Sequence, residues 1–183
     1  FAAAHRDQPS LCGFEQVLPS AMGRLFEREF CAVSGVMESP ARPCVFVLGG
    51  AKISDAFLMM EQALSSGAAD LVLTGGLVAQ ILLLAKGERI GGGSLAFIRK
   101  SNYEPFIESS RPLLERYAGR ILLPADVAYL DGSGKRAEAD VRAVPADACV
   151  LDVGAKTAAL YRERIFSART VFVNGPLGVF EKP

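Results

Sequence analysis

The sequence is poor in the residues that bind transition metals, with only one histidine and four cysteines. The cysteines lie far apart, at positions 12, 31, 44 and 149, and form no C-x-x-C pair, so a zinc-binding pattern is excluded and we expect no metal ligands in this chain. Cys44 and Cys149 lie in apolar, strand-like runs and are predicted to be small core residues. Separated cysteines fit a reducing, cytoplasmic setting.

The sequence also lacks an excess of either charge. Twenty basic residues balance 20 acidic ones, and half of the residues are apolar, which is an ordinary globular composition. We therefore expect no nucleic-acid partner and no membrane partner. We find no signal peptide and no apolar run long enough to cross a bilayer. The sequence begins at Phe1 without a methionine and stops soon after a glycine-rich motif, which indicates a fragment of a longer protein.

The chain has two stretches of different character. Residues 1–18 are short and mixed, and a long amphipathic helix is predicted over 19–34, where it would connect two domains. After a proline-containing linker, apolar strand-like runs alternate with helical patterns. Continuous apolar strands separated by helices predict an α/β fold: three layers, α/β/α, with a mostly parallel, Rossmann-like sheet.

The pattern also gives approximate bounds for the elements of this sheet domain. Strands are predicted at 44–48, 70–74, 120–123, 125–130, 148–152 and 170–173. Helices are predicted near 53–65, 77–86, 103–118 and 156–166. Residues 91–93 are three glycines and are predicted to form a flexible loop, and 131–134 a hairpin-type turn followed by an irregular polar segment to about 146.

One stretch organises the sequence. The apolar run 45–48 stops at Gly49 and Gly50, and a helical pattern begins just after Lys52. A strand, a glycine turn and a helix N-terminus can hold a phosphate, because unpaired backbone N–H groups and the positive end of the helix dipole point at it. The spacing matches neither the Walker A loop nor G-x-G-x-x-G, so a plain tight turn remains the alternative for this stretch taken alone.

Three further strands end in small or polar turn residues, at 75–76, 152–154 and 174–175. In an open α/β sheet the ligand lies outside the C-terminal ends of the strands. Glycines at several such ends favour a ligand that passes close to the sheet edge.

Several motifs, taken in order, resemble those of phosphoglycerate kinase. They are Leu48 to Asp55 (LGGAKISD), Thr74 to Leu77 (TGGL), Leu123 to Val127 (LPADV), Asp152 to Gly154 (DVG) and Val173 to Glu181 (VNGPLGVFE). Residues 1–6 look like that family's segment at the end of its first domain. The sequence at residues 75–79 is more similar to archaeal members than to bacterial and eukaryotic ones.

The resemblance implies a two-domain enzyme closed by a hinge, in which one domain binds 3-phosphoglycerate and the other binds ADP or ATP with Mg²⁺. The reaction would be reversible phosphoryl transfer between 1,3-bisphosphoglycerate and ADP, in glycolysis or gluconeogenesis, with no oligomer required. Residues 1–18 would end the first domain, 19–34 would form the interdomain helix, and 35–183 would form an incomplete nucleotide domain.

The resemblance also implies roles for single residues. Lys52 matches the lysine that contacts the transferred phosphoryl group, and Arg6 matches the arginine that holds the remote phosphate of the substrate. The matches on the nucleotide side are backbone glycines, a residue of the adenine pocket, residues near the phosphates and the carboxylate that binds the ribose hydroxyls: Gly50, Gly75, Gly76, Leu151, Asn174, Gly175, Pro176 and Glu181.

The chain departs from the family at several positions. Ala56 stands where many members have a second lysine, Thr74 replaces the first of three glycines, and Ala155 replaces a proline. The aspartate that handles the metal would lie beyond Pro183. Two alternatives stay open: another kinase class or a nucleotide-binding dehydrogenase that shares only the sheet topology, and an inactive, truncated relative.

Overall fold

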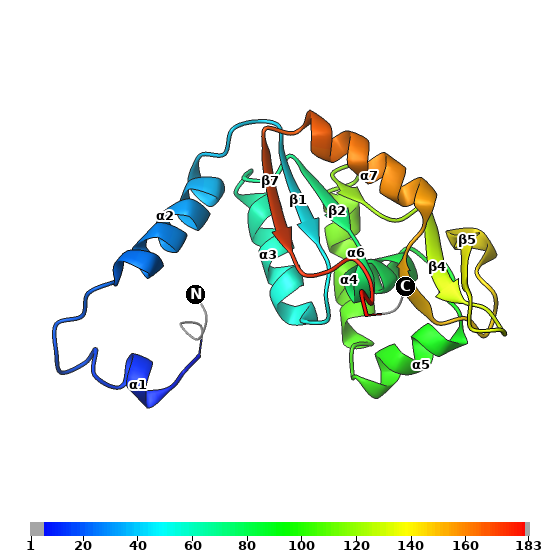
Figure 1. Cartoon of the computed structure of the whole chain (residues 1–183), viewed down its shortest axis with the longest axis horizontal. Coiled ribbons are helices and arrows are strands. Elements are labelled where there is room, and N and C mark those ends of the chain that lie inside the picture. The colour runs from blue at the N-terminus through cyan, green and yellow to red at the C-terminus, as the bar shows by residue number, and fades with distance from the viewer. Residues whose placement is uncertain (1–5, 182–183) are drawn as a thin grey trace. The chain divides into compact units, whose positions relative to one another are not determined.

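The computed structural model describes residues 6–181 and divides the chain into two compact units, one up to Pro40 and one from Ala41 (Figure 1). The predicted motif residues 1–5, among them His5, lie outside the described residues. The first unit contains two helices, α1 (Pro9–Cys12) and α2 (Arg24–Glu38). No helix among the described residues is both long enough and apolar enough to span a membrane.

The predicted helix at 19–34 is displaced in the structure. It begins after Gly23, whose extended backbone makes it the N-cap, and it continues through Gly35 to Glu38. Ser39 still donates its backbone N–H to the carbonyl of Gly35 at 3.0 Å, so Ser34 and Gly35 do not end the helix. Glycine at position 23 is costly inside a helix but acceptable at the cap, which explains the later start.

The second unit is built on a four-stranded parallel sheet in the order β3-β2-β1-β7. Its strands are β1 (Cys44–Leu48), β2 (Leu71–Thr74), β3 (Ile121–Leu122) and β7 (Thr170–Asn174). Every residue of β1 is buried, as expected for a central strand between two helical layers. The order of the strands is that of one half of a doubly wound fold and confirms the predicted α/β class.

Five helices accompany this sheet: α3 (Ile53–Ser65), α4 (Gly76–Ala85), α5 (Gly92–Lys100), α6 (Pro105–Arg116) and α7 (Ala155–Ser167). Tyr161 of α7 packs in a buried cluster with Val45, Val47 and Leu73, so α7 covers that face of the sheet (Figure 1). Successive strand residues point to opposite faces, so Phe46 faces the other helical layer. This arrangement gives the three predicted layers.

A second, antiparallel sheet was not predicted. It has the order β5-β4-β6, formed by β5 (Arg136–Asp140), β4 (Asp126–Leu130) and β6 (Val150–Val153). The run at 148–152 was expected to lie in the parallel sheet, but β6 pairs antiparallel with β4. The segment expected to be irregular contains β5 and the short 3-10 helix Val141–Ala143. A β-turn at 131–134 joins β4 to β5, as predicted.

The three glycines at 91–93 do not form the flexible loop that was expected. Gly91 has a φ of 80° and caps α5, and Gly92 and Gly93 donate their N–H groups to the carbonyls of Ala146 and Ala148 at 2.7 and 3.1 Å. A Cβ atom at Gly91 would lie 2.3 Å from the carbonyl oxygen of Ala148. The glycines are therefore required for close backbone contact with the segment before β6.

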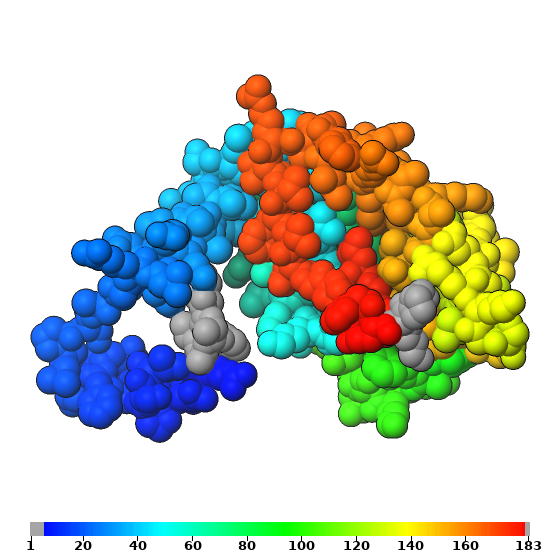
Figure 2. Space-filling view, in the orientation of Figure 1, coloured from blue at the N-terminus to red at the C-terminus, as the bar shows by residue number. Residues whose placement is uncertain are grey.

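β3 and β7 are the two edge strands of the parallel sheet, and the side chains of β7 are partly exposed. Val171 and Val173 are 39% and 63% exposed, and Figure 2 shows this orange-red strand at the surface of the second unit. Among residues 6–181, β7 pairs with β1 alone.

Candidate functional site

The register of the parallel sheet brings three strand ends to one level. Leu48 of β1 pairs with Thr74 of β2 on one side and with Asn174 of β7 on the other. The glycines that follow these residues, Gly49 and Gly75 among them, therefore lie side by side at the C-terminal edge of the sheet. This is where an open α/β sheet binds its ligand.

Backbone hydrogen bonds hold the segment after β7 against these turns. Gly50 donates its N–H to the carbonyl of Pro176 at 2.7 Å, and Gly76 donates to the carbonyl of Leu177 at 2.6 Å. A Cβ atom at Gly49 would lie 2.2 Å from the oxygen of Pro176, and one at Gly75 would lie 2.5 Å from the side chain of Leu177. Glycine at these positions therefore lets one segment pack against the ends of two strands.

The N-terminus of α3 opens at this edge with free donors. Lys52 is its N-cap, and the side chain of Lys52 is exposed. Within the described part of the chain, the N–H groups of Ala51, Lys52, Ser54 and Asp55 donate to no protein acceptor. Four unpaired amides, the positive end of a 13-residue helix and one ammonium group make this corner suitable for an anion.

The N-terminus of α7, by contrast, is occupied by protein carboxylates. The two carboxylate oxygens of Asp126 accept the N–H groups of Lys156 and Thr157 at 3.0 and 2.8 Å, and Glu138 accepts that of Ala155 at 2.9 Å. Burial raises the pKa of the Asp126 carboxyl, but hydrogen bonds from the hydroxyl and backbone of Thr157 and from the backbone of Lys156 lower it by more. The pKa is therefore below its ordinary value, and the carboxyl is held charged.

This finding corrects the interpretation of Gly154 as a turn that borders a ligand. A Cβ atom there would lie 2.3 Å from the carboxyl group of Asp126. Gly154 is therefore needed so that Asp126 can approach the helix, and β6 ends in the antiparallel sheet rather than at the shared edge.

A pocket of about 300 Å³ adjoins the α3 corner. Gly50, Ala51 and Gly76 line it at the sheet edge, and most of its other walls are apolar. Glu181 is the one carboxylate among its lining residues, and it is exposed. An apolar slot with a carboxylate at its rim and an anion corner beside it has the polarity of a nucleoside phosphate.

The predicted nucleotide residues fall into two groups in the structure. Five of them line the pocket: Gly50, Gly76, Leu151, Pro176 and Glu181. The other three lie at the adjoining strand ends: Gly75 follows β2, Asn174 is the last residue of β7, and Gly175 follows it. Lys52 lies in the α3 corner, outside the pocket lining. Arg6 belongs to the other unit and is exposed.

Several pocket residues were not predicted from the sequence. Phe97 comes from α5, and Phe180, 78% exposed, comes from the segment after β7. Gln80 is buried and donates its side-chain N–H to the carbonyl of Val150 at 3.2 Å, which ties α4 to β6. Cys149, expected in the core, is exposed and lines the pocket, whereas Cys44 is fully buried as expected. Phe180 could have been predicted as a pocket residue, because it is an aromatic residue directly before Glu181.

Two departures from the family pattern have structural explanations. Ala56, where many members have a lysine, is 1% exposed and packs inside the second unit, so this position contributes no charge to the α3 corner. Thr74 is fully buried, and its hydroxyl donates to the carbonyl of Leu122 at 2.9 Å, which binds the end of β2 to β3. Among residues 6–181 no group of three or more His, Cys, Asp or Glu side chains could hold a metal ion.

The sequence is similar to that of known proteins. The family model for phosphoglycerate kinase matches residues 1–183. The chain is 48% identical over 183 residues to the phosphoglycerate kinase of Methanothermobacter thermautotrophicus and 40% identical over 186 residues to that of Thermococcus kodakarensis. These alignments cover all of the chain but 44% and 45% of the two relatives, so the chain spans less than half of their length.

A solved structure gives the same result. The crystal structure of phosphoglycerate kinase from Pyrococcus horikoshii matches with a TM-score of 0.90 and 38% identity, over 99% of this chain and 45% of that one. The phosphoglycerate kinase of Coxiella burnetii matches with a TM-score of 0.69 and 30% identity over 87% of the chain. With its motifs in family order and a family model that matches its whole length, the chain belongs to the phosphoglycerate kinase family.

Proposed function

We propose that a protein of full family length carrying this chain is an active phosphoglycerate kinase. It would transfer a phosphoryl group reversibly between 1,3-bisphosphoglycerate and ADP, giving 3-phosphoglycerate and ATP. The observation that carries the proposal is the junction at Gly50 and Ala51, which both line the apolar pocket and lead into the open N-terminus of α3. One ligand with an apolar ring at one end and phosphates at the other would fill both the pocket and the space at the N-terminus of α3.

The nucleotide would lie with its base in the apolar part of the pocket, against Leu151, and its ribose hydroxyls donating to Glu181. A carboxylate is an acceptor only, which suits two neighbouring hydroxyl donors. The phosphates would then run past Gly50, Gly76 and Pro176 toward the amides at the start of α3. Asn174, Gly175 and Gly75 would border the phosphates from the ends of β7 and β2.

Lys52 would act on the transferred phosphoryl group. Negative charge spreads over the three equatorial oxygens in the transition state, so catalysis rests on positioning and on fixed positive charge. Lys52 is the N-cap of α3, where its ammonium group and the helix dipole would act on the same oxygens. Its side chain forms no ion pair within residues 6–181, so the charge is available to a substrate.

The acceptor side would come from the other unit. Arg6 would bind the remote phosphate of 3-phosphoglycerate through its guanidinium fork, which matches the geometry of a phosphate. Residues 1–18 would be the end of the acceptor domain, and the helix predicted at 19–34, which the structure has at Arg24–Glu38, would connect the domains. The remainder of the chain would be part of the nucleotide domain. A hinge between the domains would bring the two substrates together and exclude water.

Mg²⁺ would enter with the nucleotide. Phosphate oxygens and waters would be its main ligands, because Mg²⁺ keeps several waters and usually binds through one or two carboxylates and the phosphates of the substrate. Its chemistry there is to neutralise charge on the phosphates, and the protein ligand for it is expected outside this chain. We also propose a cytoplasmic enzyme that needs no oligomer and has no nucleic-acid or membrane partner.

Glu181→Ala tests this assignment against the alternative of another kinase or dehydrogenase that shares only the topology. In the full-length protein we expect the dissociation constant of ADP to rise about tenfold, because one charged acceptor for the ribose is lost. The control is Glu163→Ala, an exposed carboxylate on α7 outside the pocket lining. An unchanged ADP affinity by calorimetry would favour the alternative.

A coupled assay tests the second alternative, an inactive relative. The full-length protein should make ATP from ADP and 1,3-bisphosphoglycerate, and its failure to do so would support the inactive relative. The 183-residue chain alone should show no turnover, because it contains little of the acceptor domain. Measurable turnover by the chain alone would refute that part of the proposal.

A further inference from the structure

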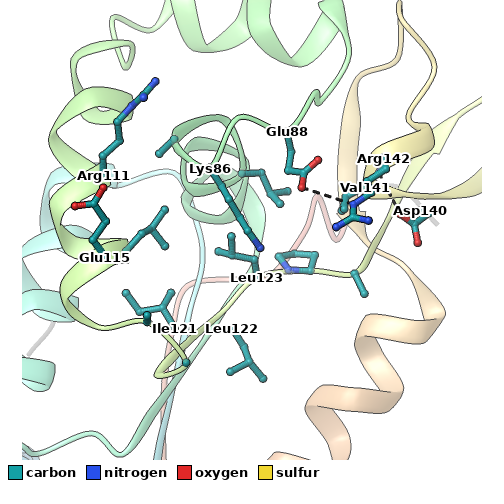
Figure 3. A pocket seen from close by; sticks show the side chains of 17 residues that line it. Lys86, Glu88, Arg111, Glu115, Ile121, Leu122, Leu123, Asp140, Val141 and Arg142 are labelled. Carbon is teal, nitrogen blue, oxygen red and sulfur yellow. Dashed lines mark hydrogen bonds and ion pairs between the residues drawn. The ribbon is translucent and has the colours of Figure 1, made fainter.

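A second and larger pocket lies away from the proposed nucleotide site. It has a volume of about 760 Å³, which is within the range of small-molecule sites. It lies between the end of α4, the end of α6, the strand β3 and the segment that follows it, and the 3-10 helix after β5 (Figure 3). It shares only Leu83 and Pro124 with a minor cavity behind α4 and no residue with the nucleotide pocket.

The walls of this pocket are apolar at the bottom and charged at the rim. Apolar residues come from α4, from α6 and the turn after it, and from β3 and the segment that follows: Leu83, Leu114, Ala118, Ile121, Leu122, Leu123 and Pro124. Most apolar residues of a protein lie in its core, so this group at the wall of an open pocket gives a ligand apolar surface to cover.

The charged residues of the rim are unequally paired. The Arg142 Nε atom lies 3.9 Å from Oε1 of Glu88, and the Arg111 Nε atom lies 3.2 Å from Oε2 of Glu108. A carboxylate oxygen of Asp140 accepts the backbone N–H of Arg142 at 3.1 Å. Lys86 makes no ion pair with any residue in the range 6–181. The ammonium group of Lys86 is therefore the available cation of this pocket.

The charged side chains of the rim also point in different directions. In Figure 3 Lys86 and Arg142 point into the same space, near Leu123, whereas Arg111 points away from it. Glu115 lies at the α6 side of the view, apart from the Lys86 ammonium group. Glu88 is 22% exposed and faces Arg142, so its charge is compensated. The space in front of Lys86 thus combines an ammonium group without an ion-pair partner among residues 6–181 with an apolar floor.

From this geometry we infer a second binding site, for a small amphiphilic anion: an apolar body that covers Leu114 and Leu123, carrying one carboxylate, sulfonate or phosphate group that pairs with Lys86. A purely inorganic anion would leave the floor uncovered, and a neutral apolar molecule would leave Lys86 without a partner. The site is independent of the proposed catalysis, because none of these residues belongs to the nucleotide pocket or the α3 corner.

Two matched probes test the inference on the full-length protein. The first is 8-anilinonaphthalene-1-sulfonate, whose fluorescence rises in an apolar site, and the second is N-phenyl-1-naphthylamine, which has the same rings without the sulfonate. We expect the sulfonate to bind saturably and to keep its affinity when Mg·ATP is present in excess. We expect the neutral probe to bind at least fivefold more weakly, and inorganic sulfate to compete only weakly.

Three variants complete the test. Lys86→Met keeps the aliphatic stem and removes the charge, and it should weaken sulfonate binding about fivefold to tenfold with no effect on the neutral probe. Ala118→Trp should fill the pocket and weaken both probes. Lys100→Met, an exposed lysine on α5 outside the pocket lining, should change neither. All three should retain kinase activity.

Other outcomes overturn the inference. Displacement of the sulfonate by Mg·ATP would place it in the nucleotide pocket. Affinities that are unchanged by Lys86→Met and by Ala118→Trp would place it on another apolar surface, such as the open edge at β7. The absence of saturable binding would show that this pocket takes no ligand of this class.

Discussion

The Tyr161 hydroxyl on α7 donates a hydrogen bond of 2.8 Å to the carbonyl of Thr74, the last residue of β2 before the glycine turn. The same oxygen lies 3.0 Å from the carbonyl of Leu122 in β3. Burial raises the pKa of Tyr161 above its ordinary value, so the hydroxyl stays protonated and remains a donor at any physiological pH. One side chain thus fixes the ends of two strands, one of which leads into Gly75 and Gly76.

Tyr161→Phe should lower the free energy of unfolding by about 1–2 kcal/mol, because it removes a buried donor and leaves backbone carbonyls with fewer partners. Urea unfolding followed by circular dichroism measures this change. Tyr129→Phe is the matched control, since the Tyr129 hydroxyl makes no hydrogen bond among the described residues. Equal effects of the two variants would show that the Tyr161 hydrogen bond contributes nothing specific.

Asp126 gives the stability a defined dependence on pH. Its pKa in the folded chain is lowered, so its contribution is fully present above the unfolded value of about 3.9 and is lost as the pH falls through the folded value. Asp126→Asn should therefore cost about 1–3 kcal/mol at pH 6, and the gap to the wild type should narrow below about pH 4.

Urea unfolding at several pH values between about 6 and about 2.5 measures the difference in unfolding free energy between the wild type and Asp126→Asn. Asp147→Asn, at an exposed position before β6, serves as the control and should stay close to the wild type throughout. A gap for Asp126→Asn that stays constant or widens toward acid would contradict the role of Asp126 as a charged cap of α7.

Gly175 tests the close packing at the sheet edge. It has a φ of 78°, and a Cβ atom there would lie 2.5 Å from the carbonyl oxygen of Gly49. Gly119 has almost the same φ, 79°, but a Cβ atom there would meet nothing within 4 Å. Gly119→Ala should therefore show the cost of the backbone conformation alone, about 1–2 kcal/mol.

Gly175→Ala should cost clearly more than Gly119→Ala and should also weaken ADP binding, because Gly49 or the segment at Pro176 must move. Unfolding free energies and calorimetric titration with ADP give both quantities. If the two variants have the same stability and the same affinity for ADP, the contact between Gly175 and Gly49 does not shape the site.

Local patterns predicted the parallel sheet and its helices well. The predicted bounds of α3 agree with the structure, because an apolar β-branched run, a glycine turn and a helical period follow one another within 21 residues, 45–65. The glycine-bearing ends of β1, β2 and β7 could be placed together because parallel strands end at one edge.

The elements that were missed depend on partners distant in the sequence. β6 begins with an apolar run like that of a parallel strand, and only its pairing with β4 reveals that it belongs to another sheet. β5 carries three charged residues in five, and this high charge suggested a solvent-exposed loop although the charged residues alternate as in a strand with one exposed face. α5 begins within the three glycines, whose N–H groups at 92 and 93 are ordered by the carbonyls of residues 146 and 148, and missing this helix concealed Phe97 as a pocket residue.

The central claim is that Lys52, at the N-terminus of α3, stabilises the transferred phosphoryl group. Lys52→Ala in the full-length enzyme tests it directly, with Lys100→Ala as the matched control, by measuring kcat and the dissociation constant of ADP for both. The account predicts that Lys52→Ala lowers kcat by about 10²–10³ while ADP binding weakens less than about fivefold, because the charge acts mainly in the transition state. Equal losses in kcat and in ADP affinity would contradict it.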